Sequence, residues 1–440
     1  MTTPLTDSFG SPTTGPSAAI AGINDFGEGL IGYQSRSVNV LETADQFPDS
    51  ALANIYAGML WMFLESPEAP EKSRPYSLRA AQAGALNARE KGLLAMLTAW
   101  QQHDYPRARA IGDRLTDDYP QDLPLLKIAQ YHAFNAGDAD HMLRLATKCL
   151  DHNVHLAPMH SMLAFAYEQC NELDKAERAA HRALDIYPAE PWAHHALAHI
   201  HLGRGTTSQG RAFLADCSST WQELNSFMFT HNWWHVALFD IALGEGEHAL
   251  SVYDERCWGV QPTYSQDQIG AVSLLARLEL AGIDVGERWQ QLLPFLVTRV
   301  DDVVQPFLTI QYLYGLAKAR SSQADTLLQL IEQQGGAPQV PSDGALWRDV
   351  GIPLAQAVVA HANGSFARTI ALIDPIRRQI WRIGGSHAQR DLFEQILLDA
   401  RLRAGQWEAA RKTLEHRRRW EPDSPVLAQR LTEVYQHLNL

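Results

Sequence analysis

The sequence predicts an all-α protein that folds as a tetratricopeptide-like α-α superhelix, a solenoid of antiparallel helix pairs. Three observations favour this fold class. A 34-residue pattern of small and aromatic residues closes at Pro188, weaker copies of it recur, and no segment alternates apolar and polar residues for the length of a strand. At 440 residues the chain exceeds what one compact core usually organises, and its 46% hydrophobic and 20% charged residues are typical of an ordered protein.

The clearest repeat unit ends at Pro188. Counting back from this proline, Ala164, Tyr167, Ala176 and Ala183 occupy the small, aromatic, small and small positions of the tetratricopeptide pattern. Two antiparallel helices approach closely only where small side chains meet, and the aromatic ring fills the gap to the next pair. The pattern therefore predicts a helix, a polar turn and a second helix.

Weaker copies of the unit lie on both sides. Ala108 with Pro120, and Ala410 with Pro422, repeat the spacing of the small residue and the closing proline. Two further segments are typical of the turn and second helix of other units, "LGEGEHALSVYDE" and "NGSFARTIALIDP".

Composition and punctuation predict four parts of the chain. Residues 1–22 are rich in Thr, Ser, Pro and Gly, lack the basic start and apolar block of a signal peptide, and are expected to form a flexible tail. Residues 23–332 are expected to be an N-terminal and central helical-repeat array. Residues 333–347 are expected to be a loop, and residues 348–440 a set of C-terminal helical repeats.

The charge and the cysteines restrict the partners and the compartment. A formal net charge of −13 disfavours nucleic-acid phosphate and anionic lipid, so we expect neither nucleic acid nor a membrane as partner. The most basic segment, residues 416–420, ends a predicted helix, where cations complement the helix dipole. No apolar run reaches the roughly 18 residues of a membrane helix. Four widely spaced cysteines without a CxxC pair are typical of reduced thiols, which favours a cytoplasmic location.

The feature most directly related to function is a repeated HxxxH motif. His195 and His199 lie one helical turn apart, and His231 and His235 repeat this spacing 36 residues later, about one repeat unit. Consecutive units superpose under such a shift, so the pairs are predicted to lie side by side on the concave face of the solenoid. Imidazole nitrogen binds transition metals well, so the four residues are a predicted site for a divalent metal, zinc or iron.

A purely structural explanation of these histidines stays open. HxxxH pairs occur by chance in helices, and buried, hydrogen-bonded packing around Trp233 and Trp234 would account for them without a ligand. If a ligand is bound, Asn232 and Trp234 are the candidate cofactor-binding residues, because they lie between His231 and His235.

A second candidate site begins at a predicted helix start. A glycine pair and a serine at residues 384–386, followed by Gln389, form a turn and a capping box. His387 and Asp391 then share a helix face, where the carboxylate is placed to orient the imidazole as a general base or a metal ligand. Arg390 is available to bind an anionic ligand. These three residues are candidate catalytic residues. The alternative is a well-capped helix whose charges are solvated.

Three long blocks carry a resemblance to a known family. "PWAHHALAHIHLGRGTTSQGRAFL", "HNWWHVALF" and "IGGSHAQRDLFEQ" resemble the tetratricopeptide repeat protein 38 family, over about residue 25 to about residue 425. The resemblance implies a helical repeat array without a well-established activity. Positions that fit the family pattern are His195, His199, His231, Asn232, Trp233, Trp234, His235, Gly384, Gly385, Ser386, His387, Gln389, Arg390 and Asp391. Two positions depart from the family pattern: Leu202 stands where a glutamate is expected, and Gly92 and Leu93 stand where a histidine is expected. If the missing glutamate serves the family as acid, base or ligand, its absence argues against hydrolytic chemistry.

The sequence thus supports three hypotheses and leaves open whether the protein is an enzyme. The leading one is a helical-repeat protein whose His-rich concave pocket binds a divalent metal and a small-molecule ligand, with metal-dependent catalysis if a coordination position stays open. The alternative is a non-catalytic tetratricopeptide adaptor that binds a peptide or partner protein in its groove. The third is metal-free catalysis by His387 and Asp391, which no nucleophile motif accompanies.

Overall fold

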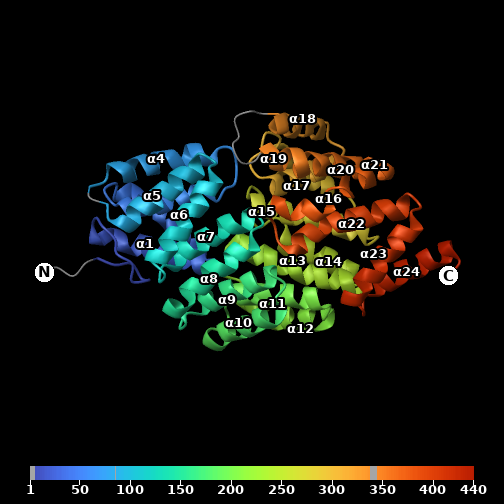
Figure 1. Ribbon diagram of the computed structural model, residues 1–440, viewed down its shortest axis with the longest axis horizontal. Coiled ribbons are helices and arrows are strands. Elements are labelled where there is room, and N and C mark those ends of the chain that lie inside the picture. The colour runs from blue at the N-terminus through green and yellow to red at the C-terminus, as the bar shows by residue number, and fades with distance from the viewer. Residues whose placement is uncertain (1–4, 85, 337–343) are drawn as a thin grey trace. The chain divides into compact units, whose positions relative to one another are not determined.

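The computed structural model describes residues 5–84, 86–336 and 344–440. In these ranges the regular elements are helices, apart from two isolated β-bridges, Thr6 with Pro12 and Gln34 with Leu224. The helices follow one another as antiparallel pairs along the chain (Figure 1). The structure therefore confirms the all-α solenoid of helix pairs. None of the described helices combines the length and the apolar character needed to cross a membrane.

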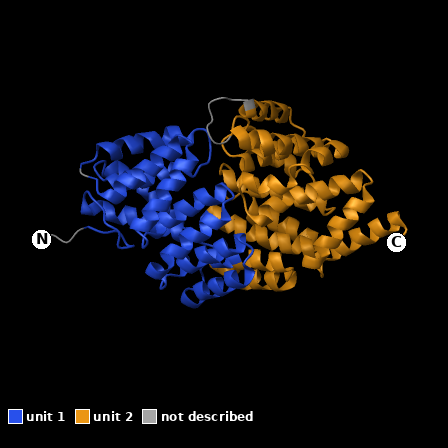
Figure 2. Cartoon of the chain, viewed as in Figure 1, with its two compact units in different colours: residues 1–196, 221–225 blue, residues 197–220, 226–440 orange. Residues whose placement is uncertain are grey.

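The chain divides into two compact units (Figure 2), residues 1–196 with 221–225, and residues 197–220 with 226–440. The helices of unit 1 are α1 (Ile20–Gly32), α2 (Asn39–Gln46), α3 (Ala51–Met62), α4 (Ala69–Gln82), α5 (Ala88–Gln101), α6 (Tyr105–Asp118), α7 (Leu123–Asn135), α8 (Ala139–Asn153), α9 (Ala157–Gln169) and α10 (Leu173–Ile186). Helix α11 (Pro191–Arg204) has residues in both units. The helices of unit 2 are α12 (Thr207–Cys217), α13 (Ser226–Leu243), α14 (Gly246–Val252), α15 (Ser265–Leu280), α16 (Arg288–Val297), α17 (Pro306–Lys318), α18 (Gln323–Gly336), α19 (Gly344–Leu346), α20 (Ile352–Ala362), α21 (Phe366–Ile373), α22 (His387–Arg403), α23 (Trp407–Trp420) and α24 (Pro425–Leu438).

The predicted loop at residues 333–347 falls inside unit 2. Helix α18 continues to Gly336, and α19 begins at Gly344. Residues 337–343 lie outside the described part of the chain, so the central portion of this prediction has no structural counterpart.

The repeat unit predicted from Pro188 is the pair α9 and α10. Its small residues Ala164, Ala176 and Ala183 are fully buried, and Tyr167 is half-buried beside them. Helix α10 buries one stripe, Ala176, Ala179, Ala180 and Ala183, which is the i, i+3, i+4, i+7 spacing of an outer helix. The alanines let the two backbones approach closely, as the pattern requires.

The first helix of several pairs is buried on nearly every side. In α17 every residue from Pro306 to Ala317 is buried, and this helix contacts α15, α16, α18 and α20. Helix α9 likewise buries residues around its whole circumference, including the polar His160, Ser161 and Glu168. A helix that is enclosed in this way loses the one-sided apolar pattern of a surface helix.

Four of the first helices carry a polar side chain in their first turn that hydrogen-bonds back to the segment preceding the helix. In each case a side-chain nitrogen donates to the backbone carbonyl six residues earlier: Asn54 to Pro48, His160 to Val154, His194 to Pro188 and Gln268 to Pro262. The histidines His160 and His194 therefore hold the junction between repeats, and neither belongs to the HxxxH pairs.

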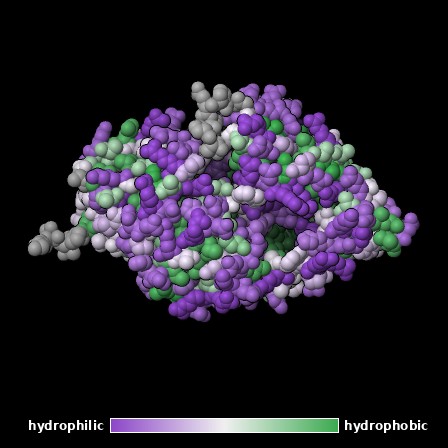
Figure 3. Space-filling model, in the orientation of Figure 1, coloured by the Kyte–Doolittle hydropathy of each residue, from purple (hydrophilic) through white to green (hydrophobic). Residues whose placement is uncertain are grey.

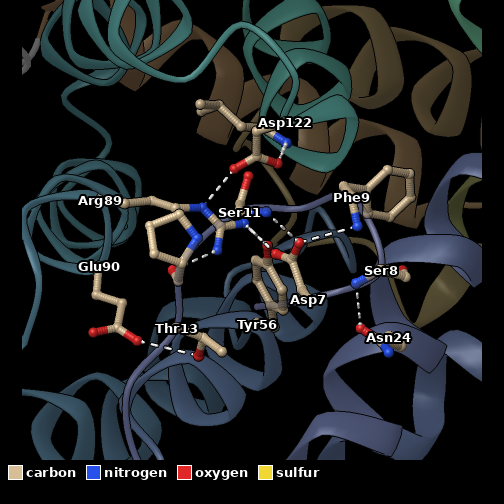
Figure 4. Close-up of polar contacts among 12 residues, drawn as sticks. Asp7, Ser8, Phe9, Ser11, Thr13, Asn24, Tyr56, Arg89, Glu90 and Asp122 are labelled. Atoms are coloured by element: carbon tan, nitrogen blue, oxygen red, sulfur yellow. Dashed lines mark hydrogen bonds and ion pairs between the residues drawn. The ribbon is translucent and has the colours of Figure 1, made fainter. Parts of the chain in front are cut away.

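The N-terminal segment differs from the predicted flexible tail. Residues 5–16 are packed onto unit 1 by a buried ionic cluster around Arg89 (Figure 4). The Arg89 guanidinium is fully buried and lies 2.9 Å from the Asp7 carboxylate and 2.6 Å from that of Asp122. Glu90 accepts hydrogen bonds from the backbone N–H and the hydroxyl of Thr14, both at 2.7 Å. A buried arginine needs carboxylate partners, and one of them comes from the segment that composition alone predicts to be loose.

Replacing Arg89 is expected to destabilise unit 1 strongly. Arg89→Leu leaves the buried carboxylates of Asp7 and Asp122 without a cation, which should lower the free energy of unfolding by about 3–5 kcal/mol in urea titrations. The control is Arg79→Leu, whose partner Asp45 is mostly exposed, and its expected loss is at most about 1 kcal/mol. Equal losses in the two variants would contradict a structural role for the cluster.

Candidate metal centre

The four histidines of the HxxxH pairs come together in the structure. His195 and His199 lie one turn apart on α11, and His231 and His235 lie one turn apart on α13. Each of them offers a ring nitrogen such that the four nitrogens all lie within 4.8 Å of one another. Pro191 starts α11, where its missing N–H costs no hydrogen bond, so the first histidine pair follows in the second and third turns.

The rings on α13 are held by aromatic neighbours. His231 is stacked between Phe227 and Trp234, with interplanar angles of 22° and 8° and centroid distances of 5.3 Å to both rings. His235 stands edge-on to His231, with centroids 5.0 Å apart, and to His199, at 4.7 Å. The three imidazoles therefore meet at different angles around one point rather than forming a stack.

His195 is fixed by the aromatic residues of its own repeat and the preceding one. Its ring stacks on Trp192 with centroids 4.2 Å apart and an angle of 21°, and Phe165 lies against it at 5.1 Å. Because Trp192 lies one turn earlier on α11, this stacking limits rotation of the imidazole.

Burial keeps the imidazoles of His231 and His235 neutral. Removal from water, with a smaller contribution from the neighbouring His199, lowers the pKa of His231 to about 3. The pKa of His235 is well below its usual value, first because of burial and then because of His199, His231 and the charge of Arg277. Neutral imidazole is the form that binds a metal, so the site needs no deprotonation near pH 7.

The sequence did not reveal Arg277, which joins the two predicted sites. This residue of α15 is buried, lies over the Trp234 ring with its guanidinium carbon 5.2 Å from the ring centroid, and donates to the Ala388 carbonyl at 2.6 Å. Burial lowers its pKa to about 10, with Asp391 acting in the opposite direction. The available signal was an arginine inside the apolar run "AVSLLARLEL", although nothing there indicates its partners.

The helix start at residues 384–389 has the predicted geometry. Ser386 and Gln389 form a capping box, and both glycines before them have positive φ, 84° at Gly384 and 77° at Gly385. A Cβ at Gly385 would lie 2.6 Å from the Phe307 ring, so a side chain does not fit there.

The charged residues on α22 have partners that the sequence did not indicate. The two carboxylate oxygens of Asp391 accept from Arg417 at 2.6 and 3.0 Å, and one of them also accepts from Gln395. Burial disfavours its ionisation, but Arg417 outweighs this effect and lowers the Asp391 pKa to about 2. Arg390 donates to the carbonyl of Gly385, and His387 is exposed. The physical reason is that the carboxylate finds a bidentate guanidinium from α23, a stronger partner than an imidazole.

The two candidate cofactor-binding residues are both buried on α13. Trp234 is 2% exposed and faces the His231 ring. Asn232 is 0% exposed, and neither its amide nitrogen nor its amide oxygen has a hydrogen-bond partner in the described structure. An unpaired buried amide is costly, so Asn232 is the polar group of this region that most clearly lacks a structural explanation.

A second group with metal-ligand spacing, Asp240, Glu245 and His248, is less suitable. The buried Asp240 carboxylate already accepts from Arg211 Nε at 2.5 Å and lies 2.8 Å from His248 Nδ1. A guanidinium at this distance neutralises the carboxylate and repels a divalent cation, so the group is explained as an ion pair.

Comparisons with known proteins identify the repeat type. A tetratricopeptide repeat family matches residues 157–200, which span α9, α10 and most of α11. The chain therefore contains tetratricopeptide-type repeats. A solved structure of Naa15/Naa10 bound to HypK-THB matches 96% of this chain and 66% of that chain, so this chain spans just under two thirds of its length. The sequence identity is 12% and the TM-score 0.26, values that carry no argument about function.

The neutral histidines make stability depend on pH. His231 has a pKa near 3 when folded and 6.5 when unfolded, so below pH 6.5 only the unfolded chain takes up the proton. The free energy of unfolding should therefore fall with decreasing pH, and His231 alone contributes about 1.4 kcal/mol per pH unit between pH 6 and 4. Urea titrations of metal-stripped protein should show a shallower pH slope for His231→Asn than for the wild type. The exposed His181→Asn control should keep the wild-type slope, and an unchanged slope for His231→Asn would contradict burial in the neutral form.

Proposed function

We propose that this tetratricopeptide-type protein binds a divalent transition metal, zinc or iron, through His195, His199, His231 and His235. The observation that carries the proposal is the convergence of four ring nitrogens from two helices within 4.8 Å. Burial of His231 and His235 in the neutral form supports it, because this is the ligating form.

The spacing is compatible with coordination after a small inward movement. Two nitrogens bound to one tetrahedral zinc lie about 3.4 Å apart when each Zn–N bond is about 2.1 Å. The imidazoles would have to move inward by small rotations about their side-chain bonds to reach this separation. Trp192 stacks on the His195 ring, and Phe227 and Trp234 stack on the His231 ring, so both rings start from defined positions. Four ligands would close the site around a structural metal, whereas three would leave a position for a small ligand and Lewis-acid chemistry.

The surroundings of the histidines favour a ligand that accepts hydrogen bonds. The Asn232 amide is the polar group of α13 whose nitrogen and oxygen are both without a partner, and Arg277 supplies a positive charge behind Trp234. A metal-bound water or a small anion would satisfy the Asn232 amide nitrogen and offset the charge of Arg277. Asn232 and Trp234 are therefore proposed to contact the metal's additional ligand, and His387 and Arg390 to stand farther from the metal, at the start of α22.

A second candidate function is that of an adaptor that binds a peptide or a partner protein. The tetratricopeptide match over residues 157–200 favours it, because such repeats form extended binding surfaces. On the face shown in Figure 3, hydrophobic residues form scattered groups within a largely hydrophilic surface. We also propose membership of the tetratricopeptide repeat protein 38 family, which both functions would suit.

Metal analysis of untagged protein tests the leading proposal. Protein purified without a histidine tag and dialysed against zinc or iron should retain about one metal ion per chain, because four imidazoles form a high-affinity site. The double variant His231→Ala with His235→Ala should retain less than about one tenth of that, because it removes half of the ligands.

The matched control is His132→Ala, a buried histidine of α7 whose edge packs on Trp100. It removes one buried imidazole from a first helix, half of what the double variant removes, and should leave the metal content unchanged. Absence of stoichiometric metal in the wild type, or equal loss in the two variants, would exclude the metal site. Capture of one stoichiometric protein partner by metal-free protein would then favour the adaptor.

The orphaned amide gives a separate test. Asn232→Leu replaces an unsatisfied buried amide with an apolar side chain of similar size, so metal-stripped protein should be as stable as the wild type or gain about 1 kcal/mol. The same variant should lose affinity for small anionic ligands such as azide when metal is bound. A large loss of stability in the stripped protein would show that the amide has a structural partner.

A further inference from the structure

A cavity lies in unit 2, and none of its lining residues belongs to α11 or α13. Its volume is about 340 Å³, and it is open to solvent on one side. The lining residues that matter most for its chemistry are Glu279, Asp284, Tyr314, Lys318, His361 and Asp399. A volume of this size is that of a small-metabolite site rather than of a cleft for a folded partner.

The cavity lies where four first helices end. Glu279 is at the end of α15, Lys318 at the end of α17, His361 at the end of α20, and Asp399 in the last turns of α22. These helices are mutual neighbours, since α17 contacts α15 and α20, and α22 contacts the same two. The C-terminal end of each helix carries a partial negative charge, so the backbone of all four favours a cation in the cavity.

Three side chains form a hydrogen-bond relay in the cavity wall. His361 Nε2 lies 3.0 Å from a carboxylate oxygen of Asp399, and His361 Nδ1 lies 2.9 Å from the Tyr314 hydroxyl. Burial raises the pKa of Asp399, but the hydrogen bond from His361, together with nearby charges that include Arg403, outweighs this and leaves the pKa lowered, so the carboxylate is ionised. With Nε2–H donating to that carboxylate, Nδ1 accepts the proton of the Tyr314 hydroxyl.

The relay therefore presents an electron-rich acceptor to the cavity. The Tyr314 hydroxyl donates its hydrogen bond to His361, so the lone pairs of its oxygen remain able to accept a hydrogen bond from a ligand. Hydrogen bonds in series polarise one another, so the charge of Asp399 strengthens this acceptor. A ligand that meets this oxygen gains most if it donates an N–H or O–H.

The charged side chains of the cavity point to the same kind of ligand. Glu279 is paired with Lys318 at 2.5 Å, and Arg403 lies 3.6 Å from Asp399. Asp284 accepts the backbone N–H of Gly286, and among the described residues no cation lies within salt-bridge distance of it. The Asp284 carboxylate is exposed and interacts with the Arg288 charge only beyond salt-bridge distance, so it adds a negative charge to that of the four helix ends.

We propose that this cavity binds a small aliphatic amine in its ammonium form, with Asp284 as the counter-ion and the Tyr314 oxygen as the hydrogen-bond acceptor. The site is separate from the histidine cluster, because none of its lining residues is among the four proposed metal ligands. The relay positions the Tyr314 hydroxyl, and His361 and Asp399 act through it rather than on the ligand.

Calorimetric titration with amines and carboxylates of matched size tests the proposal. Putrescine and ethanolamine should bind saturably with Kd below about 1 mM, and succinate should give no binding. Asp284→Asn, which keeps the acceptor for Gly286, should weaken amine binding at least about tenfold because it removes the counter-ion. Tyr314→Phe should weaken it about tenfold by removing one acceptor.

Two controls separate this site from the rest of the chain. Asp325→Asn removes an exposed carboxylate in the first turn of α18 and should leave amine binding unchanged. The double variant His231→Ala with His235→Ala should also bind putrescine normally, so failure of the metal proposal would not affect this one. No binding of either amine, stronger binding of succinate, or amine binding unaffected by Asp284→Asn would overturn the proposal.

Discussion

The structure depends on one packing constraint: the first helix of each pair is enclosed by its partner and by the helices of adjacent pairs. Helix α17 buries twelve consecutive residues, whereas the outer helix α10 buries a single alanine stripe. Small residues such as Ala164, Ala176 and Ala183 make this enclosure possible, because they let the helix axes approach closely. The enclosure also sets the conditions for the polar groups on these inner helices.

A polar side chain on an enclosed helix must be hydrogen-bonded, ion-paired or neutral. His160 and His194 meet the requirement by donating to a carbonyl of the preceding turn. Arg89 meets the requirement with two buried carboxylates, and Arg277 meets it with backbone carbonyls at the start of α22. The histidines on α13 meet it by remaining neutral, which burial enforces. The burial that stabilises the repeats therefore also keeps the His231 and His235 imidazoles in the neutral form that the proposed metal site requires.

Local and periodic features were predictable from the sequence, and long-range pairings were not. The repeat around Pro188, the capping box at Ser386 and the convergence of the HxxxH pairs all follow from spacing, which each repeat reproduces. The pairing of Asp391 with Arg417 was missed because 26 residues separate them and neither carries a local signature of the other. The cavity of unit 2 was invisible for the same reason, since its lining extends from Glu279 to Arg403.

Histidine and asparagine at positions 231, 232 and 235 are poor choices for stability alone. Leucine or alanine at these positions would pack an enclosed helix without the loss of stability that a buried imidazole causes below pH 6.5, and without leaving an amide unsatisfied. A buried amide with no hydrogen-bond partner, such as that of Asn232, is characteristic of sites where function is retained at the expense of stability. His160 and His194, by contrast, each donate to a defined partner, the backbone carbonyl six residues earlier. Asn232 has no such partner, and this contrast, more than the number of histidines, argues that α13 is built around a ligand.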